Sequence, residues 1–188
     1  DSHPTDTHLK RTTILVNDCA GSIAFYRDVI GMTEYYNQTM SVGGKIIPAG
    51  EPGAEVHLGI MEGNRSDIAK LGILEWTGPR LPENTGFADR TRLGIGDTVF
   101  VCETPDMDPL IKRLEASPDC RIYCPPHDWS VPTPDGKGQI EMTTLSFFDP
   151  DGFFYEVNHK RNAPNIEAFG IKRTTLIVRD IQKSVDFY

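Results

Sequence analysis

The side chains with the clearest potential for chemistry are His57, Asp97, Glu156 and Arg11. Imidazole nitrogens and carboxylate oxygens bind divalent cations. Arginine keeps its proton in proteins, so it cannot bind a metal but can pair with a carboxylate. Glu156 stands between a tyrosine and a valine, and a carboxylate in such an apolar segment needs a metal or a cation as its partner. Each of these side chains could therefore take part either in a metal site or in an arginine–carboxylate pair.

An internal repeat organises the elements that must position these residues. Residues 9–26 (LKRTTILVNDCAGSIAFY) match residues 171–188 (IKRTTLIVRDIQKSVDFY) without a gap, and nine of the eighteen positions are identical. Residue 171 therefore begins a second copy of the structure that begins at residue 9. The prolines and asparagines of residues 162–165 are typical of a linker between two copies.

Within the first copy, residues 11–16 are predicted as a strand. Asp18 is expected to cap the helix that follows, and Gly31 to end it. The next strands are expected at residues 33–40, 45–49 and 55–61, and residues 62–93 are predicted to be irregular.

The same order of elements then returns, with a strand at 97–103 and a helix at 105–116. The remaining strands are expected at residues 121–124, 141–148 and 153–159, with a long loop at 125–138. The chain therefore reads as two βαβββ modules.

Two segments make a family resemblance specific. Residues 11–32 (RTTILVNDCAGSIAFYRDVIGM) look like the opening of glyoxalase and bleomycin-resistance proteins, and residues 147–157 (FFDPDGFFYEV) resemble the closing strand, with a DPDG turn before a glutamate. The chain thus resembles the vicinal oxygen chelate superfamily, which also includes extradiol dioxygenases. The resemblance implies an α+β fold of paired βαβββ modules whose curved sheets form a cleft.

The expected domains follow from this resemblance and from the repeat. Residues 1–8 form an N-terminal tail, and residues 9–165 form a glyoxalase-like domain. Its modules span about 9–61 and 94–160 and are joined by 62–93. Residues 166–188 are expected to be the start of a second glyoxalase-like domain.

The resemblance implies four metal positions, on the first and last strands of each module. They fall at Arg11, His57, Asp97 and Glu156. His57, Asp97 and Glu156 could hold a divalent ion (Mn, Ni, Mg, Fe or Zn). Arginine in place of the family histidine, repeated at Arg173, instead favours a metal-free cleft in which Arg11 pairs with Glu156 or Asp97.

Each of these residues also has a plainer interpretation. Strand alternation places His57 opposite an aliphatic face, so we expect it to line the cleft, but it could simply be a half-buried strand histidine. Asp97 follows two glycines and could be a turn residue. Trp129 and His127, on the loop at 125–138, are expected to contact a ligand.

Composition narrows the expected partners. The formal net charge is −8, which disfavours nucleic acid. No apolar run approaches the roughly 20 residues that a membrane-spanning helix needs. The expected partners are a small molecule and, for assembly, a second copy of the chain. The default location is the cytoplasm, although the first residue is not Met and a removed leader stays open. The four cysteines contain no C-x-x-C pair and are expected to be reduced.

Two functions remain open at this point. One is a lyase-, isomerase- or dioxygenase-like enzyme in which Glu156 and Arg11 act on a small oxygenated molecule. The other is a metal-free binding protein of the bleomycin-resistance kind, with ligand contacts at His57, Asp97, His127 and Trp129.

Overall fold

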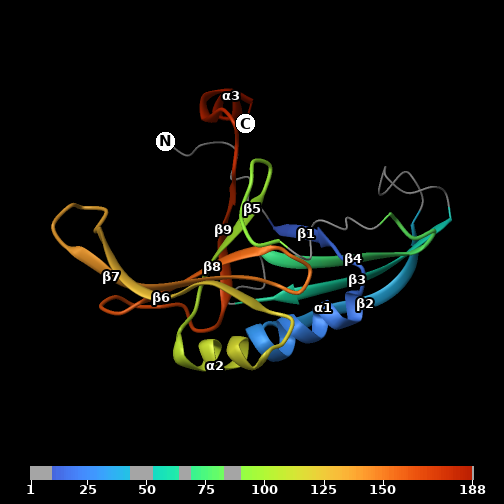
Figure 1. Ribbon diagram of the computed structural model, residues 1–188, viewed down its shortest axis with the longest axis horizontal. Coiled ribbons are helices and arrows are strands. Elements are labelled where there is room, and N and C mark those ends of the chain that lie inside the picture. Colours follow the sequence, from blue (N-terminus) through green and yellow to red (C-terminus); the bar gives the residue numbers. More distant parts are fainter. Residues whose placement is uncertain (1–9, 43–52, 64–68, 83–89, 188) are drawn as a thin grey trace. The chain divides into compact units, whose positions relative to one another are not determined.

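The structure is a computed structural model that describes residues 10–42, 53–63, 69–82 and 90–187 (Figure 1). The chain divides into two compact units, residues 1–83 and residues 84–188. Each unit builds its own sheet and is described by itself. None of the helices in the described ranges combines the length and the apolar character that a membrane-spanning helix needs.

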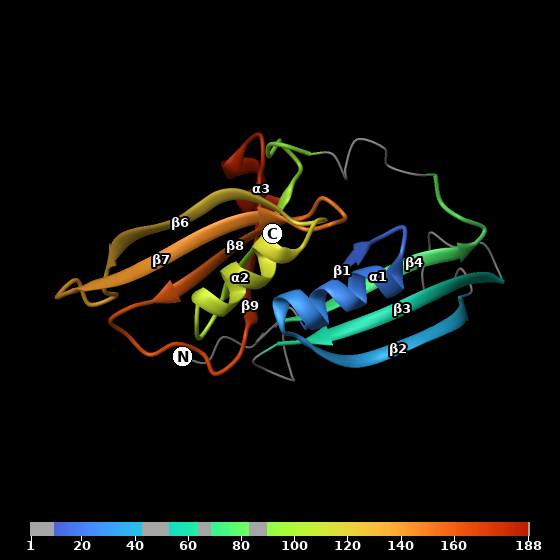
Figure 2. The same cartoon turned by 60° about the horizontal axis from the view of Figure 1, so that its bottom comes forward.

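In its described residues, unit 1 forms a four-stranded sheet with one helical segment. Its strands are β1 (Arg11–Leu15), β2 (Thr33–Val42), β3 (Ala54–Glu62) and β4 (Lys70–Gly78), in the order β1-β4-β3-β2. Strand β1 runs parallel to β4, and the other pairs are antiparallel. Helix α1 (Cys19–Ala24) continues into a π-helical turn, η1 (Phe25–Ile30), and packs against β3 and β4 (Figure 2).

Local chemistry sets the ends of this helical segment, as the sequence predicts. The Asp18 side chain accepts a hydrogen bond from the backbone N–H of Gly21 at 3.0 Å and so caps α1. Gly31 adopts φ of 91°, the left-handed conformation that a glycine reaches without strain, and turns the chain into β2.

Unit 2 is a five-stranded sheet with two helices. Its strands are β5 (Thr98–Glu103), β6 (Arg121–Pro132), β7 (Gln139–Phe148), β8 (Phe154–Lys160) and β9 (Gly170–Leu176), and its helices are α2 (Asp108–Ala116) and α3 (Ile181–Phe187). The strand order is β6-β7-β8-β5-β9. Strand β5 runs parallel to β8, as β1 runs parallel to β4, so the βαβββ topology of unit 1 is repeated. The expected α+β fold of paired βαβββ modules is confirmed.

Two segments expected to be irregular are strands. Residues 70–78 form β4, so the first module extends to residue 78 and not to residue 61. Residues 125–132, expected to be a loop, belong to β6. Strand β6 tolerates Pro125 and Pro126 because it lies at the edge of the sheet and its register shifts there. The strand expected at 45–49 lies outside the described residues.

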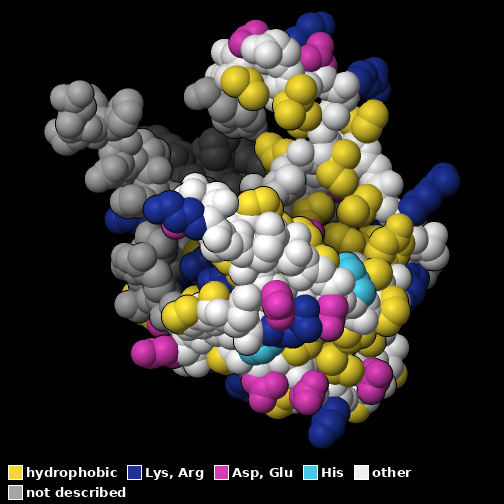
Figure 3. Space-filling view, turned by 90° about the vertical axis from the view of Figure 1, so that its left-hand side faces the viewer, with side chains coloured by type: hydrophobic (Ala, Val, Ile, Leu, Met, Phe, Trp, Pro, Cys, Tyr) yellow, Lys and Arg dark blue, Asp and Glu magenta, His cyan; other side chains and the backbone are white. Residues whose placement is uncertain are grey.

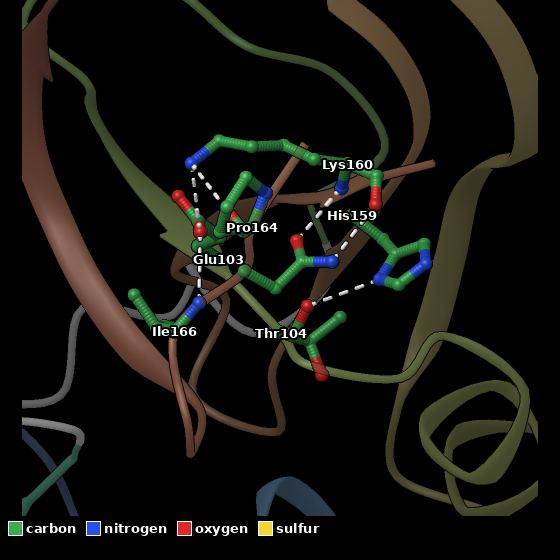
Figure 4. A network of polar contacts seen from close by, with 7 residues as sticks. Glu103, Thr104, His159, Lys160, Pro164 and Ile166 are labelled. Atoms are coloured by element: carbon green, nitrogen blue, oxygen red, sulfur yellow. Dashed lines mark hydrogen bonds and ion pairs between the residues drawn. The ribbon is translucent and has the colours of Figure 1, made fainter. Parts of the chain in front are cut away.

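The segment between β8 and β9, expected to be a linker, is tied to β5 by the buried carboxylate of Glu103 (Figure 4). Glu103 Oε1 accepts hydrogen bonds from Lys160 Nζ and from the backbone N–H of Ile166, both at 3.1 Å. The Asn165 side chain bonds both backbone groups of Lys160, at 2.8 Å each. These contacts fix the path by which the chain returns to form β9 on the edge of β5.

Candidate functional site

The two faces of the five-stranded sheet differ in character. One face carries Phe100, Tyr155 and Phe147, whose rings stack at 5.0 Å and 5.2 Å between centroids and are fully buried. Strand alternation places the neighbouring residues on the opposite face. There a small apolar cluster of Val99, Val101, Phe148 and Phe154 lies beside Glu156 and a set of polar side chains. We call this the Glu156 face.

A directional chain of hydrogen bonds crosses the Glu156 face from β6 to β8. Trp129 Nε1 donates to Thr144 Oγ1 at 2.6 Å, and Thr144 Oγ1 donates to Asn158 Oδ1 at 2.5 Å. Asn158 Nδ2 then donates to Glu156 Oε1 at 3.1 Å. Each donor polarises the group that follows it, which strengthens the next hydrogen bond. The carboxylate of Glu156 is the last acceptor of the chain. Thr144 is buried, whereas Trp129 is 40% exposed, so the chain runs from the surface inward.

The structure brings three of the predicted site residues together on this face: Glu156, Trp129 and His127. Trp129 pairs in register with Met142, and His127 with Thr144, both from β7. The expectation that His127 and Trp129 lie on a loop is wrong, because both are on strand β6. His127 Nδ1 lies 3.3 Å from the Pro125 carbonyl oxygen and 3.6 Å from Cys124 Sγ.

Sequence reasoning missed the two residues that link Trp129 to Glu156. Asn158 lies two residues after Glu156 on the same strand, so strand alternation alone could have placed it on the same face. Thr144 could not be found in this way, because its role depends on the register Thr144↔Asn158 between β7 and β8.

Arg173 is the further residue on this face that the repeat could have indicated. In the antiparallel pair of β5 and β9 it lies opposite Val101, and in the parallel pair of β5 and β8 Val101 lies opposite Glu156. Arg173 and Glu156 therefore stand in one row, two strand spacings or about 10 Å apart. The Arg173 side chain is exposed, and Glu156 is half-buried.

Asp97 takes the turn role that the sequence left open. Its carboxylate forms an ion pair with Arg90 and accepts a hydrogen bond from the backbone N–H of Gly94. Gly96, in the same turn, adopts φ of 96°. A carboxylate engaged by an arginine and by its own turn is a poor ligand for a cation, because both contacts would have to be given up.

His57 lies on the face that helix α1 covers, so the expectation that it lines a cleft opposite this helix is wrong. A Cβ atom at Gly59, two residues further along β3, would lie 2.5 Å from Ile23 Cδ1 of α1. His57 shares that face by alternation and pairs in register with Thr39 and Glu75. Its Nε2 lies 2.6 Å from Asn37 Oδ1, which is the plainer role of a half-buried strand histidine.

The last strand of the first module is β4, so the family's last-strand position must be sought there. In the second module Glu156 pairs with Val101, four residues after Asp97; in the first, Leu74 pairs with Leu15, four residues after Arg11. Leu74 is 6% exposed and packs in an apolar cluster with Trp76. The first module therefore presents leucine and arginine at its two family positions, and neither can bind a metal.

The donor set does not fit the metal centre that the family implies. Of the four family positions, Arg11 and Leu74 offer no ligand and Asp97 is engaged by Arg90, which leaves Glu156. Within the described ranges, no group of three or more His, Cys, Asp or Glu side chains is arranged to hold a metal ion. Arg11 does share a face with Leu74, since a Cβ atom at Gly72 would lie 3.2 Å from Arg11 Cδ.

The Glu156 carboxylate acts electrostatically on the thiol of Cys102. Burial raises the pKa of the Cys102 thiol well above its ordinary value, and the Glu156 carboxylate adds to this effect. Cys102 is therefore an uncharged residue of the interior. All four cysteines are free, as expected.

Comparison with known proteins gives one family and a set of solved structures. The sequence profile of the Glyoxalase/Bleomycin resistance protein/Dioxygenase superfamily matches residues 8–157. No curated protein matches the chain. A glyoxalase family protein from Bacillus cereus is 13% identical with a TM-score of 0.61, over 85% of this chain and 98% of that chain. Glyoxalase I from Zea mays is 16% identical with a TM-score of 0.59, over 96% of this chain and 53% of that chain.

The solved structures and the family profile support different conclusions. At such low identity the two solved structures show the fold alone, and the chain spans about half the length of the maize enzyme. The family profile covers most of the chain, including β1, α1 and the strand that carries Glu156. The protein belongs to the Glyoxalase/Bleomycin resistance protein/Dioxygenase superfamily.

Proposed function

We propose that this protein binds a small oxygenated molecule on the Glu156 face without the help of a metal ion. The observation that carries the proposal is the hydrogen-bond chain that ends on Glu156. It engages the Glu156 carboxylate by protein groups alone. Arg11 and Leu74 supply no ligand at their family positions, and the Asp97 carboxylate is engaged by Arg90. Trp129 offers a partly exposed ring at one end of the chain, and the buried cluster of Val101, Phe148 and Phe154 gives this face an apolar base under its polar side chains.

The chemistry of the face indicates the class of ligand. Among the described residues, the one hydrogen bond to the Glu156 carboxylate comes from Asn158, so its remaining lone pairs can accept hydrogen bonds from ligand hydroxyl groups. Arg173, in the same row, can bind a carboxylate or another acceptor. A molecule with neighbouring hydroxyl groups, or a 2-hydroxy acid, suits both partners.

Titration of the protein with catechol and with malate tests this proposal, in buffer containing EDTA. The chain has two tryptophans, and Trp76 is buried in unit 1, so a change in tryptophan fluorescence reports mainly on Trp129. We expect saturable binding of at least one probe, weakened about tenfold or more by Glu156→Gln, because a hydrogen bond to a charged acceptor is worth about 1.5–3 kcal/mol. Glu141→Gln, an exposed glutamate paired with Arg161 on the opposite face of β7, is the matched control.

Two results would contradict the proposal. One is loss of binding in EDTA that added Mn or Ni restores, which would mean that a metal carries the ligand. The other is equal weakening by Glu156→Gln and Glu141→Gln, which would place the ligand away from the Glu156 face.

A second function, proton abstraction by Glu156, is favoured by the same carboxylate geometry. A general base needs a carboxylate oxygen that the protein leaves available, and a hydroxyl group next to a carbonyl is the substrate pattern that such a base serves. Hydroxyacetone in D₂O is the probe. The carboxylate would take a proton from the carbon beside the carbonyl and return a deuteron, so deuterium would enter the probe faster with the wild type than with Glu156→Gln.

A further inference from the structure

Strand β6 is irregular where it passes Pro125 and Pro126. Its register on β7 shifts between Ile122 and Cys124, and again between Cys124 and His127. At each shift β6 contains one residue more than β7, so the alternation of its side chains between the two faces is interrupted. Side chains that a regular strand would hold apart can therefore meet on one face.

Both ends of the second irregular stretch lie on the Glu156 face. Cys124 pairs with Ser146 of β7, and Ser146 pairs with Glu156 of β8. Paired residues of neighbouring strands project from the same face, so Cys124 and Glu156 share one row, about two strand spacings or 10 Å apart. His127 pairs with Thr144, which belongs to the hydrogen-bond chain of this face.

The thiol of Cys124 and the imidazole of His127 are in contact. Nδ1 of His127 lies 3.6 Å from Cys124 Sγ and 3.3 Å from the Pro125 carbonyl oxygen. A carbonyl oxygen can only accept a hydrogen bond, so a proton on Nδ1 satisfies it, and Nε2 is then the nitrogen that can take up a proton. The backbone of Pro125 therefore holds the imidazole with its Nδ1–H beside the sulfur, and a thiol, an imidazole and a third group that orients the imidazole are the parts of an activated cysteine.

This pair is open to the solvent. His127 is exposed, and Cys124 is half-buried. Figure 3 faces the end of the molecule where β6 and β7 lie in Figure 1, and it shows histidine side chains among those that reach the surface there. A reactive cysteine needs such access as well as a group that favours the thiolate.

The other cysteines lack one or both of these properties. Cys19 and Cys102 are buried, with exposed fractions of 0% and 1%. Cys120 is partly exposed, but burial, and secondly the charge of Asp149, raises its pKa to about 12. Cys124 therefore has three internal controls within the same chain.

An aromatic ring beside Cys124 indicates the class of molecule that can reach the sulfur. Tyr123 is 52% exposed, and its ring packs edge-on against Phe148 and Phe154 of the Glu156 face, with centroids 5.8 Å and 5.5 Å apart. The exposed part of this ring offers an apolar surface next to the thiol. A flat, conjugated carbon electrophile suits this surface better than a small polar oxidant does.

We propose that Cys124 is a nucleophile assisted by His127, and that it binds small α,β-unsaturated carbonyl compounds covalently. The Nδ1–H of His127 donates a hydrogen bond to the thiolate. The sulfur forms a bond to the β-carbon, the electrons of the double bond move towards the carbonyl group, and the α-carbon takes up a proton in place of the one that the thiol has lost. Thiol and acceptor thus give a thioether, and no further reactant is needed. The proposal rests on other side chains than the ligand binding proposed for Glu156.

Labelling with N-ethylmaleimide at pH 7, followed by mass spectrometry of peptides, tests the proposal on the native protein. We expect Cys124 to react about tenfold or more faster than Cys120, and Cys19 and Cys102 to stay unlabelled while the protein is folded. If Cys120 reacts as fast as Cys124, the thiol of Cys124 has no special reactivity and the proposal is wrong.

A matched pair of variants separates assistance by the imidazole from simple access. His127→Asn should slow the labelling of Cys124 about fivefold or more, because the donor to the thiolate is moved away. Asp128→Asn, at the next and also exposed position, should leave the rate within about twofold, because Asp128 bonds Thr143 and Arg161 instead. The melting temperature of each variant shows that its fold is kept. A rate that is unchanged or higher in His127→Asn would show that the imidazole only covers the thiol, which would overturn the proposal.

Glu156→Gln separates this inference from the function proposed above. We expect it to leave the labelling rate of Cys124 within about twofold, since the carboxylate lies about 10 Å along the row. Labelling that is slowed as much as in His127→Asn would mean that the thiol depends on the carboxylate and would contradict the role given to His127. Failure of catechol and malate to bind would overturn the proposed function and leave the reactivity of Cys124 as it is.

Discussion

Arg173 and Glu156 stand on either side of Val101 in one row of the five-stranded sheet, on the same face. The pair places a cation about two strand spacings from the carboxylate at a family position that serves metal binding in other members. Because Arg173 repeats Arg11, each copy of the repeat carries an arginine at the first-strand position. This relationship is the physical basis for expecting ligands that combine a hydrogen-bond donor with an anionic group.

The first prediction separates the roles of the two charges. Arg173→Gln should weaken malate binding about tenfold, because a charge-assisted hydrogen bond to the carboxylate is lost, and should leave catechol affinity within about twofold. Lys172→Gln, one residue earlier and also exposed, is the control. Fluorescence titration with both probes measures the effect. Equal losses for malate and catechol would mean that Arg173 supports the fold of the face and not the recognition of an anion.

The second prediction concerns the hydrogen-bond chain itself. Thr144→Val keeps the shape of the side chain but removes the group that links Trp129 to Asn158, so the free energy of unfolding should fall by about 1–2 kcal/mol. Thr143→Val, which removes a hydrogen bond to exposed Asp128, should cost less than about 0.5 kcal/mol. Urea denaturation of both variants gives the comparison. Similar losses of unfolding free energy in the two variants would show that the hydrogen bonds of Thr144 stabilise the protein no more than the exposed hydrogen bond of Thr143.

The third prediction addresses metal ions. Dialysis against EDTA, and addition of Mn, Ni, Zn or Fe afterwards, should leave the melting temperature unchanged, because a ligand that binds the folded state alone would raise it. Elemental analysis of the purified protein is the companion measurement. Near one equivalent of a tightly held ion, lost in Glu156→Ala, would show that the missing ligands come from elsewhere and that Glu156 completes a metal site.

The sequence predicts the strand that carries Glu156, but it does not predict the face of His57 or the full length of β6. The DPDG motif predicts the turn before the last strand and so the strand on which Glu156 lies; the structure has β8 at Phe154–Lys160, with Gly152 at φ of 85°. The prediction assigns His57 to the wrong face of β3. Both faces of this strand carry buried residues, so alternation divides the residues into two sets but does not show which set faces helix α1. The sequence predicts a strand that ends at residue 124, whereas β6 continues to Pro132. Pro125 counts against a strand unless the strand is known to lie at the edge of a sheet.

Strand β4 shows a different limit. Residues 71–76 are apolar except for Gly72 and Glu75, a run that fits a strand covered on both faces, and Leu71, Ile73 and Trp76 are all buried. The polar, glycine- and proline-rich residues around it concealed the run. Without β4 the family's last-strand position was assigned to His57, and the leucine that stands there went unnoticed. The strand registers identify Leu74 as the counterpart of Glu156, which composition alone does not show.

The fourth prediction uses the pH dependence of stability. Burial, and secondly the negative charge of Asp149, raises the pKa of Cys120 from 9.0 to about 12. A thiol whose folded-state pKa is raised contributes stability that is complete below pH 9 and is lost as the pH rises from 9 towards 12, because the unfolded chain releases the proton first. Urea denaturation at pH 8 and pH 10.5 should therefore show a smaller decrease for Cys120→Ser than for the wild type. Parallel decreases would mean that Cys120 does not control this range.

The last prediction concerns the contact by which α1 covers its sheet. A Cβ atom at Gly59 would lie 2.5 Å from Ile23 Cδ1 and 2.7 Å from Ile23 Cγ1, so Gly59→Ala should destabilise the protein by about 1–3 kcal/mol. Ile23→Val removes Cδ1 and should cost about 0.5–1.5 kcal/mol by itself. Because it removes the nearer of the two clashing atoms but keeps Cγ1, it relieves part of the clash, and the double variant should be more stable than the sum of the two losses by about 0.5 kcal/mol. Gly138→Ala, where the nearest side-chain atom would be at an ordinary 3.5 Å, should have little effect. Strict additivity in this cycle would show that the backbone of β3 moves at Gly59 to accommodate the methyl group, and that the Ile23 side chain does not limit the space there.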